Sequence, residues 1–366
     1  MQYRCELCGY RSPKWMGFCP QCRGTEALQG EAGLGPAGKA AAPAALAEVV
    51  STQVTRRPVG IGEVDRVLGG GIVPGAALLL GGEPGVGKST LLLQMAGRVA
   101  SSGVAVLVAT AEESAEQVGL RARRLLVEEA GVYVLAERDV EAIIAAAAEL
   151  GPGLLVVDSI QAVAADDVVG APGGVAQVRE CAARLLQFAK ESSVPVIVVG
   201  HVTKEGGLAG PKLLEHIVDV VLYLEGDLER GFRVLRGLKN RFGATHQVGL
   251  FEMGGTGLSE VADPGAALVA GWQGGVPGSV VFPAIDGRRP LLVEVQALIN
   301  EATTPQPRRS VKGIDSARVH QLLAVLDRHA GLSFAAKDVY VGVVGGIRVS
   351  EPAADLPVAV ALASSL

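Results

Sequence analysis

The sequence predicts an α/β fold whose main domain is built on a mostly parallel, doubly wound sheet. Between residues 51 and 263, short apolar runs alternate with segments of helical periodicity, the pattern of chains that pack helices on both faces of a sheet. The apolar runs are continuous, which is typical of strands buried on both faces. A glycine-rich loop at 82–89 also joins one apolar run to an apolar helix, a unit that occurs in open α/β sheets.

The strands of this sheet are predicted from the apolar runs. Six runs are expected to form its parallel part: residues 76–81, 104–110, 132–136, 154–158, 194–200 and 217–224. Two later runs, at 232–239 and 246–253, follow one another with no helical pattern between them. They are therefore predicted to extend the sheet with antiparallel strands.

Helix boundaries are marked by capping residues. Ser114 and Gln117 have the spacing of a capping box, which predicts a helix start at this point. Asp139 can cap a helix over 140–150, and Gly151 is expected to end it in a left-handed conformation.

Length and composition bound the organisation. The 366 residues exceed one ordinary domain, and 49% of them are hydrophobic, enough for more than one core. We predict a cysteine module at 1–28, a Gly/Ala/Pro-rich flexible linker at 29–50, the α/β domain at 51–263 and a last domain at 264–366. The last domain is expected to be α+β, with a strand at 291–299, a helix at 316–330, a strand at 339–344 and a helix from 352 onward. Since that helix reaches the final residue without a cap, this domain is expected to be incomplete.

Charge and hydropathy exclude some classes of protein. The net charge of −5 excludes a uniformly basic nucleic-acid binder, but it leaves room for local basic patches. The first residues are polar, unlike a secretory signal, and the apolar runs are too short to span a bilayer. A cytoplasmic protein without a membrane partner is expected.

Four of the five cysteines form a spaced set. Cys5 and Cys8 make one Cys-x2-Cys pair and Cys19 and Cys22 another, a spacing that predicts a zinc ribbon with a closed tetrahedral Zn²⁺ site of structural role. The alternative is two disulfides or free thiols. The basic and aromatic residues around the cysteines could contact single-stranded DNA, or could be solvated charge around a core tryptophan, Trp15.

The glycine-rich loop carries the strongest motif. Eight residues match G-x-x-x-x-G-K-[ST] in full: Gly82, Glu83, Pro84, Gly85, Val86, Gly87, Lys88 and Ser89. Lying between a strand and a helix that continues with Thr90, the loop is expected to bind ATP or ADP through its backbone amides and the helix N-terminus. Lys88 is expected to reach the β- and γ-phosphates, and Ser89 to ligate Mg²⁺. A ligand-free turn is the alternative.

Two further carboxylates fit this chemistry. Asp158 ends an apolar strand and is expected to hold Mg²⁺ together with Ser89. Glu112 and Glu113 follow the strand at 104–110, at the sheet edge where ligands bind. We assign the general base to Glu112 and keep Glu113 as second choice; both could instead be solvated carboxylates near a helix N-terminus.

The order of motifs resembles one family. The cysteine module precedes Gly-Glu-Val-Asp-Arg-Val-Leu-Gly-Gly-Gly at 62–71, the phosphate loop, Asp-Ser-Ile-Gln at 158–161 and Lys-Asn-Arg-Phe-Gly at 239–243. This order resembles the bacterial RadA (Sms) family of RecA-like DNA-repair ATPases over nearly the whole chain. The last motif discriminates best, because generic P-loop ATPases lack it.

The resemblance implies a RecA-like core, an N-terminal C4 zinc finger and a C-terminal domain like the protease domain of Lon. It also implies a DNA-dependent ATP hydrolase that forms homohexameric rings, translocates on single-stranded DNA and promotes branch migration with RecA as a helicase. The alternative is a nucleotide-gated DNA-binding ring that recruits or regulates other recombination proteins without motor activity.

The resemblance also marks residues outside the phosphate loop. Lys239 and Arg241 alternate with Asn240, so they are expected to project to one face. They could act on a neighbouring subunit's nucleotide, as an arginine finger does, or on DNA phosphate; a solvated strand end is the bland alternative.

Two loops resemble the mobile DNA-binding loops of RecA. In the segment that begins at His201, this histidine could sense the γ-phosphate, and Lys204 and Lys212 could meet DNA. Residues 166–174 form the second loop. A plain glycine-rich surface loop would look much the same.

The segment at 349–355 resembles the part of Lon that carries its nucleophilic serine. The matching position here is Ala353, and alanine cannot attack a carbonyl. Ser350 lies nearby but out of frame. Protease activity is therefore not expected, and a ring-building or DNA-binding platform is the expected role.

Overall fold

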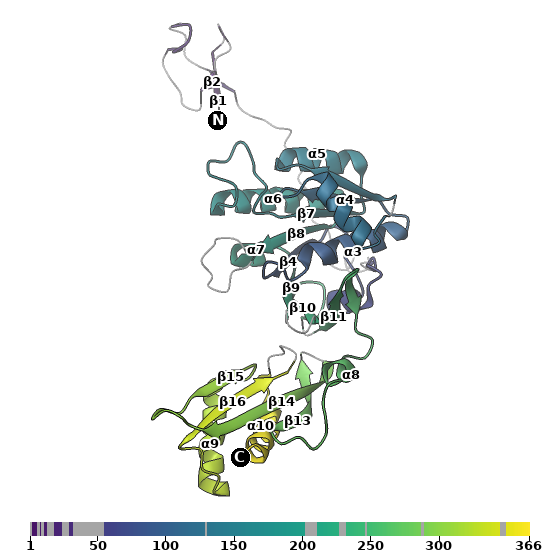
Figure 1. Ribbon diagram of the computed structural model, residues 1–366. Coiled ribbons are helices and arrows are strands. Elements are labelled where there is room, and N and C mark those ends of the chain that lie inside the picture. The colour runs from purple at the N-terminus through teal and green to yellow at the C-terminus, as the bar shows by residue number, and fades with distance from the viewer. Residues whose placement is uncertain are drawn as a thin grey trace, which may run out of the picture. The chain divides into compact units, whose positions relative to one another are not determined.

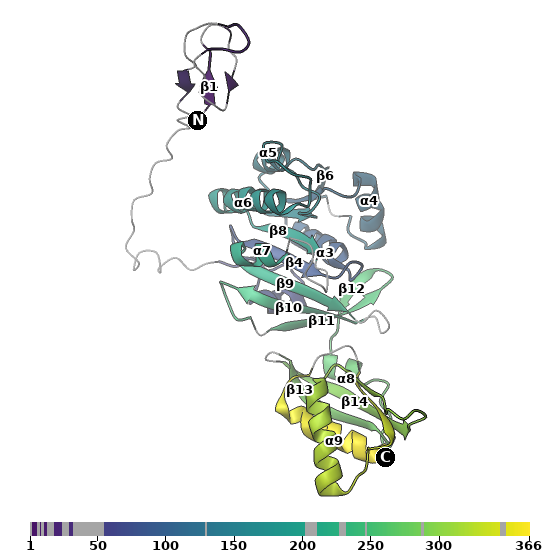
Figure 2. The same ribbon diagram turned by 90° about the vertical axis from the view of Figure 1, so that its left-hand side faces the viewer.

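The chain folds into two compact units, Met1–Gln53 and Val54–Leu366, which are described separately below. The computed structural model (Figures 1 and 2) describes residues 2–5, 8, 11–12, 18–23, 29–31, 55–128, 130–201, 211–226, 232–245, 247–286, 289–344 and 349–366. Most of the predicted linker, as well as Lys14 and Trp15, lies outside these residues.

The first unit contains a small antiparallel sheet. Its strand order is β2-β1-β3, with β1 at Gln2–Arg4, β2 at Arg11–Ser12 and β3 at Gln29–Glu31. Because β3 pairs with β1, the folded module extends three residues beyond the boundary predicted at residue 28.

The second unit begins with a nine-stranded sheet of order β12-β11-β10-β9-β4-β8-β7-β5-β6. Its parallel strands are β4 Ala77–Gly82, β5 Val106–Thr110, β6 Val132–Ala136, β7 Leu154–Asp158, β8 Val196–His201 and β9 Val220–Gly226. The antiparallel additions are β10 Phe232–Asn240, β11 Val248–Gly254 and β12 Gly257–Glu260. The mostly parallel sheet with an antiparallel edge is thus confirmed.

Helices cover both faces of this sheet (Figures 1 and 2). They are α2 Gly62–Leu68, α3 Lys88–Ser101, α4 Ala115–Arg124, α5 Val140–Leu150, α6 Val175–Ser192 and α7 Pro211–Ile217. Successive side chains of β4 enter opposite cores, because strand side chains alternate between faces. Leu78 and Leu80 pack with α2 and α3, whereas Ala77 and Leu79 pack with α5 and α6. The doubly wound architecture follows from this division.

The predicted caps are confirmed. Ser114 accepts a hydrogen bond from the Gln117 amide, and the Gln117 side chain accepts one from the Ser114 amide, so the capping box is complete. Asp139 caps α5, and Gly151 ends it with a φ of 60°.

One burial prediction is wrong. The run at 132–136 was expected to be buried on both faces, but β6 is the last strand of the sheet and pairs only with β5 among the described residues. Tyr133 is 47% exposed as a result. A continuous apolar run does not reveal whether its strand lies at the centre or the edge of a sheet.

The C-terminal part of the second unit is α+β, as predicted. Its sheet has the order β13-β14-β16-β15, with β13 Ser279–Asp286, β14 Arg289–Glu301, β15 Arg309–Lys312 and β16 Lys337–Val343. It is accompanied by α8 Pro264–Leu268, α9 Ser316–Ala330, the 3₁₀ turn η1 Pro352–Ala354 and α10 Asp355–Ser364. Val319 and Leu323 of α9 are buried in the core of this part.

This part packs against the antiparallel edge of the larger sheet. Val234, Val248 and Leu250 belong to the same core cluster as the strands of the smaller sheet. The buried Glu63 carboxylate of α2 accepts hydrogen bonds from the Leu250 amide, at 2.9 Å, and from the Arg289 guanidinium.

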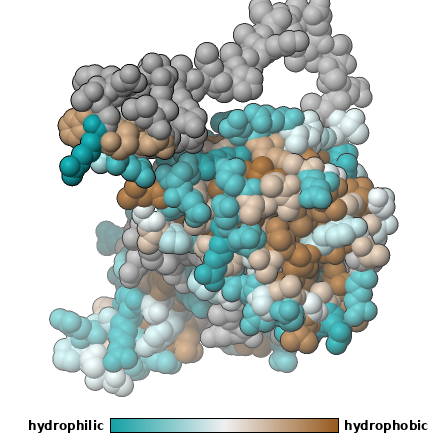
Figure 3. Space-filling model, turned by 90° about the horizontal axis from the view of Figure 1, so that it is seen from above, coloured by the Kyte–Doolittle hydropathy of each residue, from teal (hydrophilic) through white to brown (hydrophobic). Residues whose placement is uncertain are grey.

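The surface mixes polar and apolar side chains, as Figure 3 shows for one face. Such a mixture is usual for folded proteins, whose surfaces retain much apolar area. Within the described ranges, no helix is both long and apolar enough to cross a bilayer.

Candidate nucleotide and metal sites

The phosphate loop connects β4 to α3 as predicted. Gly82 and Gly87 both have positive φ, 150° and 114°. A Cβ on Gly82 would lie 2.5 Å from the Leu224 carbonyl oxygen, so no other residue fits there. No side chain caps the N-terminus of α3 at Gly87, which leaves the first-turn amides of the helix for an anion.

Lys88 lies across this loop. Its Nζ donates to the carbonyl oxygens of Gly82, at 2.9 Å, and Glu83, at 3.0 Å, and the residue is only 4% exposed. Burial lowers the pKa of Lys88, while the negative charges of Asp158 and Glu112 oppose that shift. The ammonium group therefore lies within the field of both carboxylates.

Strand pairing brings these two carboxylates together. In the register of β5 and β7, Thr110 lies opposite Asp158, and the Ala111 amide donates to the Asp158 carbonyl at 2.9 Å. Glu112 follows directly after this contact. The carboxyl ends of adjacent parallel strands meet at one edge of a sheet, and β4 delivers the phosphate loop to that same edge.

The two candidate bases occupy different surroundings. Glu113 forms an ion pair with Arg121 at 2.5 Å, and its amide donates to the Thr110 hydroxyl. Glu112 instead accepts a hydrogen bond from the hydroxyl of Ser159, the residue after Asp158. Of the two, Glu112 faces the chemistry of the phosphate loop.

The oxygen donors fit a magnesium ion. Ser89 is the second residue of α3 and offers a hydroxyl, while Asp158 ends β7 and offers a carboxylate. Mg²⁺ prefers oxygen ligands and commonly binds through one or two protein groups plus phosphate oxygens. Thr90, the next residue of α3, is half-buried beside them.

The four cysteines of the first unit come together. Their Sγ atoms all lie within 4.8 Å of one another, with Cys5–Cys22 at 3.7 Å and Cys8–Cys19 at 3.5 Å. A tetrahedron of sulfurs about 2.3 Å from a zinc ion has edges of about 3.8 Å, whereas a disulfide bond is about 2.05 Å long. The thiols therefore fit a closed structural Zn²⁺ site, and the disulfide alternative is excluded.

The environment of Cys19 also suits a metal ligand. Burial raises the pKa of this thiol, but hydrogen bonds from the backbone amides of Cys22 and Gln21 outweigh that effect and bring its pKa to about 7. Zinc binds the thiolate form, so a lowered pKa favours binding near neutral pH.

Lys239 and Arg241 share a face, as predicted. Both approach the buried carboxylate of Asp219: Arg241 Nη1 lies 3.3 Å from Asp219 Oδ1, while Lys239 donates to the carbonyls of Glu215, His216 and Val218 at the end of α7. Asn240 turns the other way and donates to Leu68. Arg241 is 54% exposed.

These cations lie at the sheet edge opposite the phosphate loop. Asp219 Oδ2 accepts a hydrogen bond from the amide of Ala77, the first residue of β4, whereas the loop follows Gly82 at the other end. Five steps along a strand cover roughly 17 Å at about 3.3 Å per residue. Within one chain, Arg241 cannot reach a nucleotide bound at Lys88.

The predicted loops are only partly described. Lys204 and the side chains of His201 and Lys212 lie outside the described residues. The loop at 166–174 is held in place: Gln177 bonds to the Ala165 and Val168 carbonyls, and Asp167 pairs with Arg184 at 2.7 Å. This anchoring differs from the mobile loop suggested by the resemblance.

Three residues of interest were missed by the sequence analysis. Ser159 bonds Glu112, Asp219 joins β4 to the Lys239 and Arg241 cations, and the buried Arg233 donates to the Val86 carbonyl of the phosphate loop at 2.8 Å. Of these, only Ser159 had a sequence signal, its place directly after Asp158.

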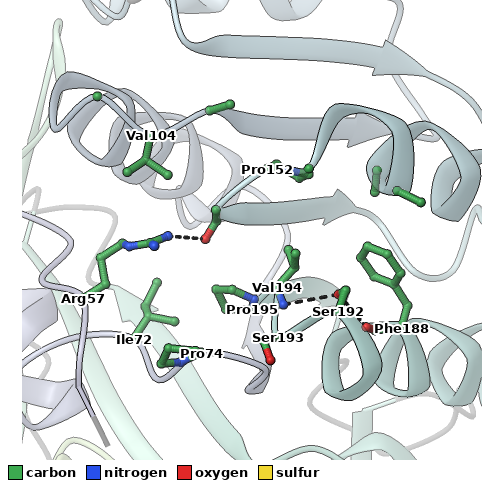
Figure 4. A pocket seen from close by; sticks show the side chains of 16 residues that line it. Arg57, Ile72, Pro74, Val104, Pro152, Phe188, Ser192, Ser193, Val194 and Pro195 are labelled. Carbon is green, nitrogen blue, oxygen red and sulfur yellow. Dashed lines mark hydrogen bonds between the residues drawn. The ribbon is translucent and has the colours of Figure 1, made fainter.

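A cavity of about 650 Å³ lies apart from this site (Figure 4). It is lined by residues that precede the parallel strands, including Val104, Pro152 and Pro195, and by Phe188 of α6. Arg57 closes one side by donating to the Gly153 carbonyl at 2.7 Å. The cavity is therefore at the amino edge of the sheet, away from the phosphate loop.

Comparisons with known proteins agree with this geometry. An AAA domain family matches residues 43–207, and a rubredoxin metal binding domain family matches residues 3–29. The chain is 44% identical to DNA repair protein RadA of Bacillus subtilis (strain 168) and 47% identical to that of Pseudomonas aeruginosa, in each case over 100% of this chain and 82% of the relative.

The chain belongs to the RadA family of DNA repair proteins. Among solved structures, it resembles the ATPase domain of another protein with a TM-score of 0.50 at 15% identity, covering 59% of this chain and 95% of that one. This likeness concerns the fold alone and agrees with the RecA-like sheet. The cofactors of the chain are ATP or ADP with Mg²⁺ in the ATPase domain and a structural Zn²⁺ in the ribbon.

The C-terminal part agrees with membership of the RadA family. Ala353 lies exposed in the turn η1 and Ser350 lies just before it. A methyl group at Ala353 offers no nucleophile, so protease activity is still not expected.

Proposed function

We propose that this RadA family member hydrolyses ATP in a DNA-dependent manner and uses the energy to translocate on single-stranded DNA. The observation that carries the proposal is the meeting of Lys88, Asp158 and Glu112 at one sheet edge, delivered there by β4, β7 and β5. Phosphoryl transfer requires positioning and charge stabilisation above all, and this edge supplies both.

In the proposed hydrolysis, each residue has one task. The loop amides and Lys88 hold the β- and γ-phosphates, and a Mg²⁺ ion held by Ser89 and Asp158 would neutralise phosphate charge. Glu112 orients a water molecule and takes its proton while the water oxygen bonds to the γ-phosphorus. The bond to the bridging oxygen breaks, and its electron pair stays on the ADP oxygen.

Arg241 is proposed to act on another molecule. Its distance from Lys88 within the chain and its exposure both favour a role in trans. In a hexameric ring, it would supply an arginine finger to the neighbour's γ-phosphate, or it would grip DNA phosphate. Lys239 is proposed to support Arg241, because its ammonium group already bonds three carbonyl oxygens.

The biological role follows from the family. The relatives are DNA repair proteins, and we propose that this chain promotes branch migration of recombination intermediates together with RecA. With a net charge of −5, the chain needs local cations for DNA contact, and Lys204, Lys212 and Arg241 are the proposed ones.

Turnover measurements test the proposal. ATP hydrolysis by the full chain is expected to rise at least about tenfold on addition of single-stranded DNA, and a three-strand exchange assay should show extended branches in the presence of RecA. ATP binding without DNA-stimulated hydrolysis would instead support a nucleotide-gated ring without motor activity. A folded chain that fails to bind ATP with Mg²⁺ would reject both.

A further inference from the structure

Ser159 is a fully buried hydroxyl residue beside the proposed site. It follows Asp158 at the carboxyl end of β7 and is 0% exposed. A buried hydroxyl costs free energy unless it finds a hydrogen-bond partner. Here, it donates to Oε1 of Glu112, the carboxylate to which the proposed function gives the role of general base.

We propose that Ser159 is a positioning residue that orients the Glu112 carboxylate toward the attacking water. The inference rests on the proposed function, since it needs Glu112 to act as base. It adds a residue whose only role in hydrolysis is through Glu112, without contact to the nucleotide.

The backbone around Glu112 is held, but its side chain is not held by the same contacts. The Ala111 amide donates to the Asp158 carbonyl at 2.9 Å, and the Glu113 amide donates to the Thr110 hydroxyl at 3.1 Å. A glutamate side chain has several rotatable bonds, so its carboxylate can point in several directions unless a contact fixes it. The bond from Ser159 selects one direction for the carboxylate.

Ser159 itself is firmly mounted. The Ala162 amide donates to its carbonyl oxygen at 3.1 Å, and the next residue, Ile160, donates its amide to the Val199 carbonyl of β8 at 3.1 Å. The hydroxyl therefore stands on a backbone tied to a neighbouring strand. Rigid supports of this kind allow a catalytic group to be placed within a few tenths of an ångström.

The chemistry of the bond suits a general base. A hydroxyl that donates to a carboxylate forms a charge-assisted hydrogen bond, which is stronger than one between neutral groups. It engages Oε1 and leaves Oε2 as the oxygen that can accept a proton from water. Glu113 has no such arrangement, because its carboxylate is paired with Arg121.

Steady-state kinetics of the full chain with saturating single-stranded DNA test the proposal. Ser159→Ala is expected to lower kcat about tenfold, because a misdirected base loses part of the roughly 10²- to 10⁴-fold that general base catalysis typically contributes. The KM for ATP and the Kd for ADP should stay within about twofold, since Ser159 does not touch nucleotide. Ser159→Cys, with a weak S–H donor, should fall between Ala and wild type. Ser102→Ala, at the opposite edge of the sheet, is the matched control and should match wild type.

A double-mutant cycle separates positioning from general structural damage. In a Glu112→Gln background, Ser159→Ala should change kcat by less than about twofold, because residues that act as a unit are not additive. The proposal is overturned if the two losses multiply, if Ser159→Ala retains wild-type kcat, or if ADP affinity falls in parallel with turnover. Wild-type turnover by Glu112→Gln alone would instead reject the base assignment in the proposed function.

Discussion

The Arg241 guanidinium lies 3.3 Å from the carboxylate of Asp219, and Asp219 in turn bonds the amide that begins β4. The same strand ends at the phosphate loop. A single strand thus separates the exposed cation from the nucleotide site of its own chain, which places the two at opposite edges of the sheet.

Replacing Arg241 tests its proposed action in trans. Arg241→Ala is expected to lower DNA-stimulated turnover at least about 100-fold, in line with the loss of an arginine finger. The affinity of each chain for ADP should change less than about threefold, because its own phosphate loop lies at the other edge. Steady-state turnover assays and calorimetric ADP titration measure the two effects. Arg123→Ala removes an arginine that is 78% exposed and serves as control. Unchanged turnover together with unchanged DNA affinity would contradict the assignment.

Replacing Lys88 tests the phosphate loop. Lys88→Ala is expected to abolish detectable ATP binding, since it removes the cation proposed to hold the β- and γ-phosphates. The domain should remain folded, with a loss of about 1–3 kcal/mol from the two carbonyl contacts. Isothermal titration and urea unfolding provide the measurements, with the exposed Lys312→Ala as control. Retained micromolar affinity for ATP would speak against the loop.

Removing zinc tests the independence of the two units. Cys19→Ser, or a strong chelator, is expected to unfold the first unit, which has little core apart from the four thiols. ATP binding by the second unit should persist, because Met1–Gln53 and Val54–Leu366 are separate compact units. Zinc content by mass spectrometry and ADP affinity are the readouts. Loss of both together would show that the units depend on one another.

Replacing Arg289 tests the contact between the two parts of the second unit. Arg289→Ala leaves the buried Glu63 carboxylate without its cationic partner and is expected to cost about 3–5 kcal/mol. The comparison is Arg318→Ala, whose partner Asp355 is 39% exposed and whose loss should lower stability far less, because solvent screens exposed pairs. Urea unfolding of both variants decides. Equal losses would mean that the Glu63 contact gains nothing from burial.

The Arg318–Asp355 ion pair predicts a pH dependence. The hydrogen bond from the Arg318 guanidinium holds the pKa of Asp355 below its usual value of 3.8. Since the folded-state pKa is lowered, the pair stabilises the fold fully above about pH 4 and loses that effect as the pH falls through the lower value. The difference in unfolding midpoint between wild type and Arg318→Ala should therefore shrink between about pH 7 and about pH 3. A constant difference would contradict this.

Features that depend on neighbouring residues in the chain were predictable. The phosphate loop at 82–89, the capping box of Ser114 and Gln117, the C-cap at Gly151 and the paired cysteines are each defined by short spacings. Their physical causes are local, because a turn, a cap or a knuckle depends on a few successive dihedral angles.

Contacts between distant segments were not predictable in this way. The choice between Glu112 and Glu113 depends on Ser159 and Arg121, and the position of Lys239 depends on the end of α7. The edge position of β6 likewise depends on the order of strands, and an apolar run carries no information about its neighbours.

The amino-acid order by itself determined the kinds of chemistry available: a phosphate loop, a thiolate metal site, and a cationic motif at 239–243. Only the tertiary structure decided which side chains meet, because the pairing of β4, β5 and β7 brings Lys88, Asp158 and Glu112 to one edge and leaves Arg241 at the other. The reason is geometric: parallel strands align their carboxyl ends, and this alignment joins residues that are far apart along the chain.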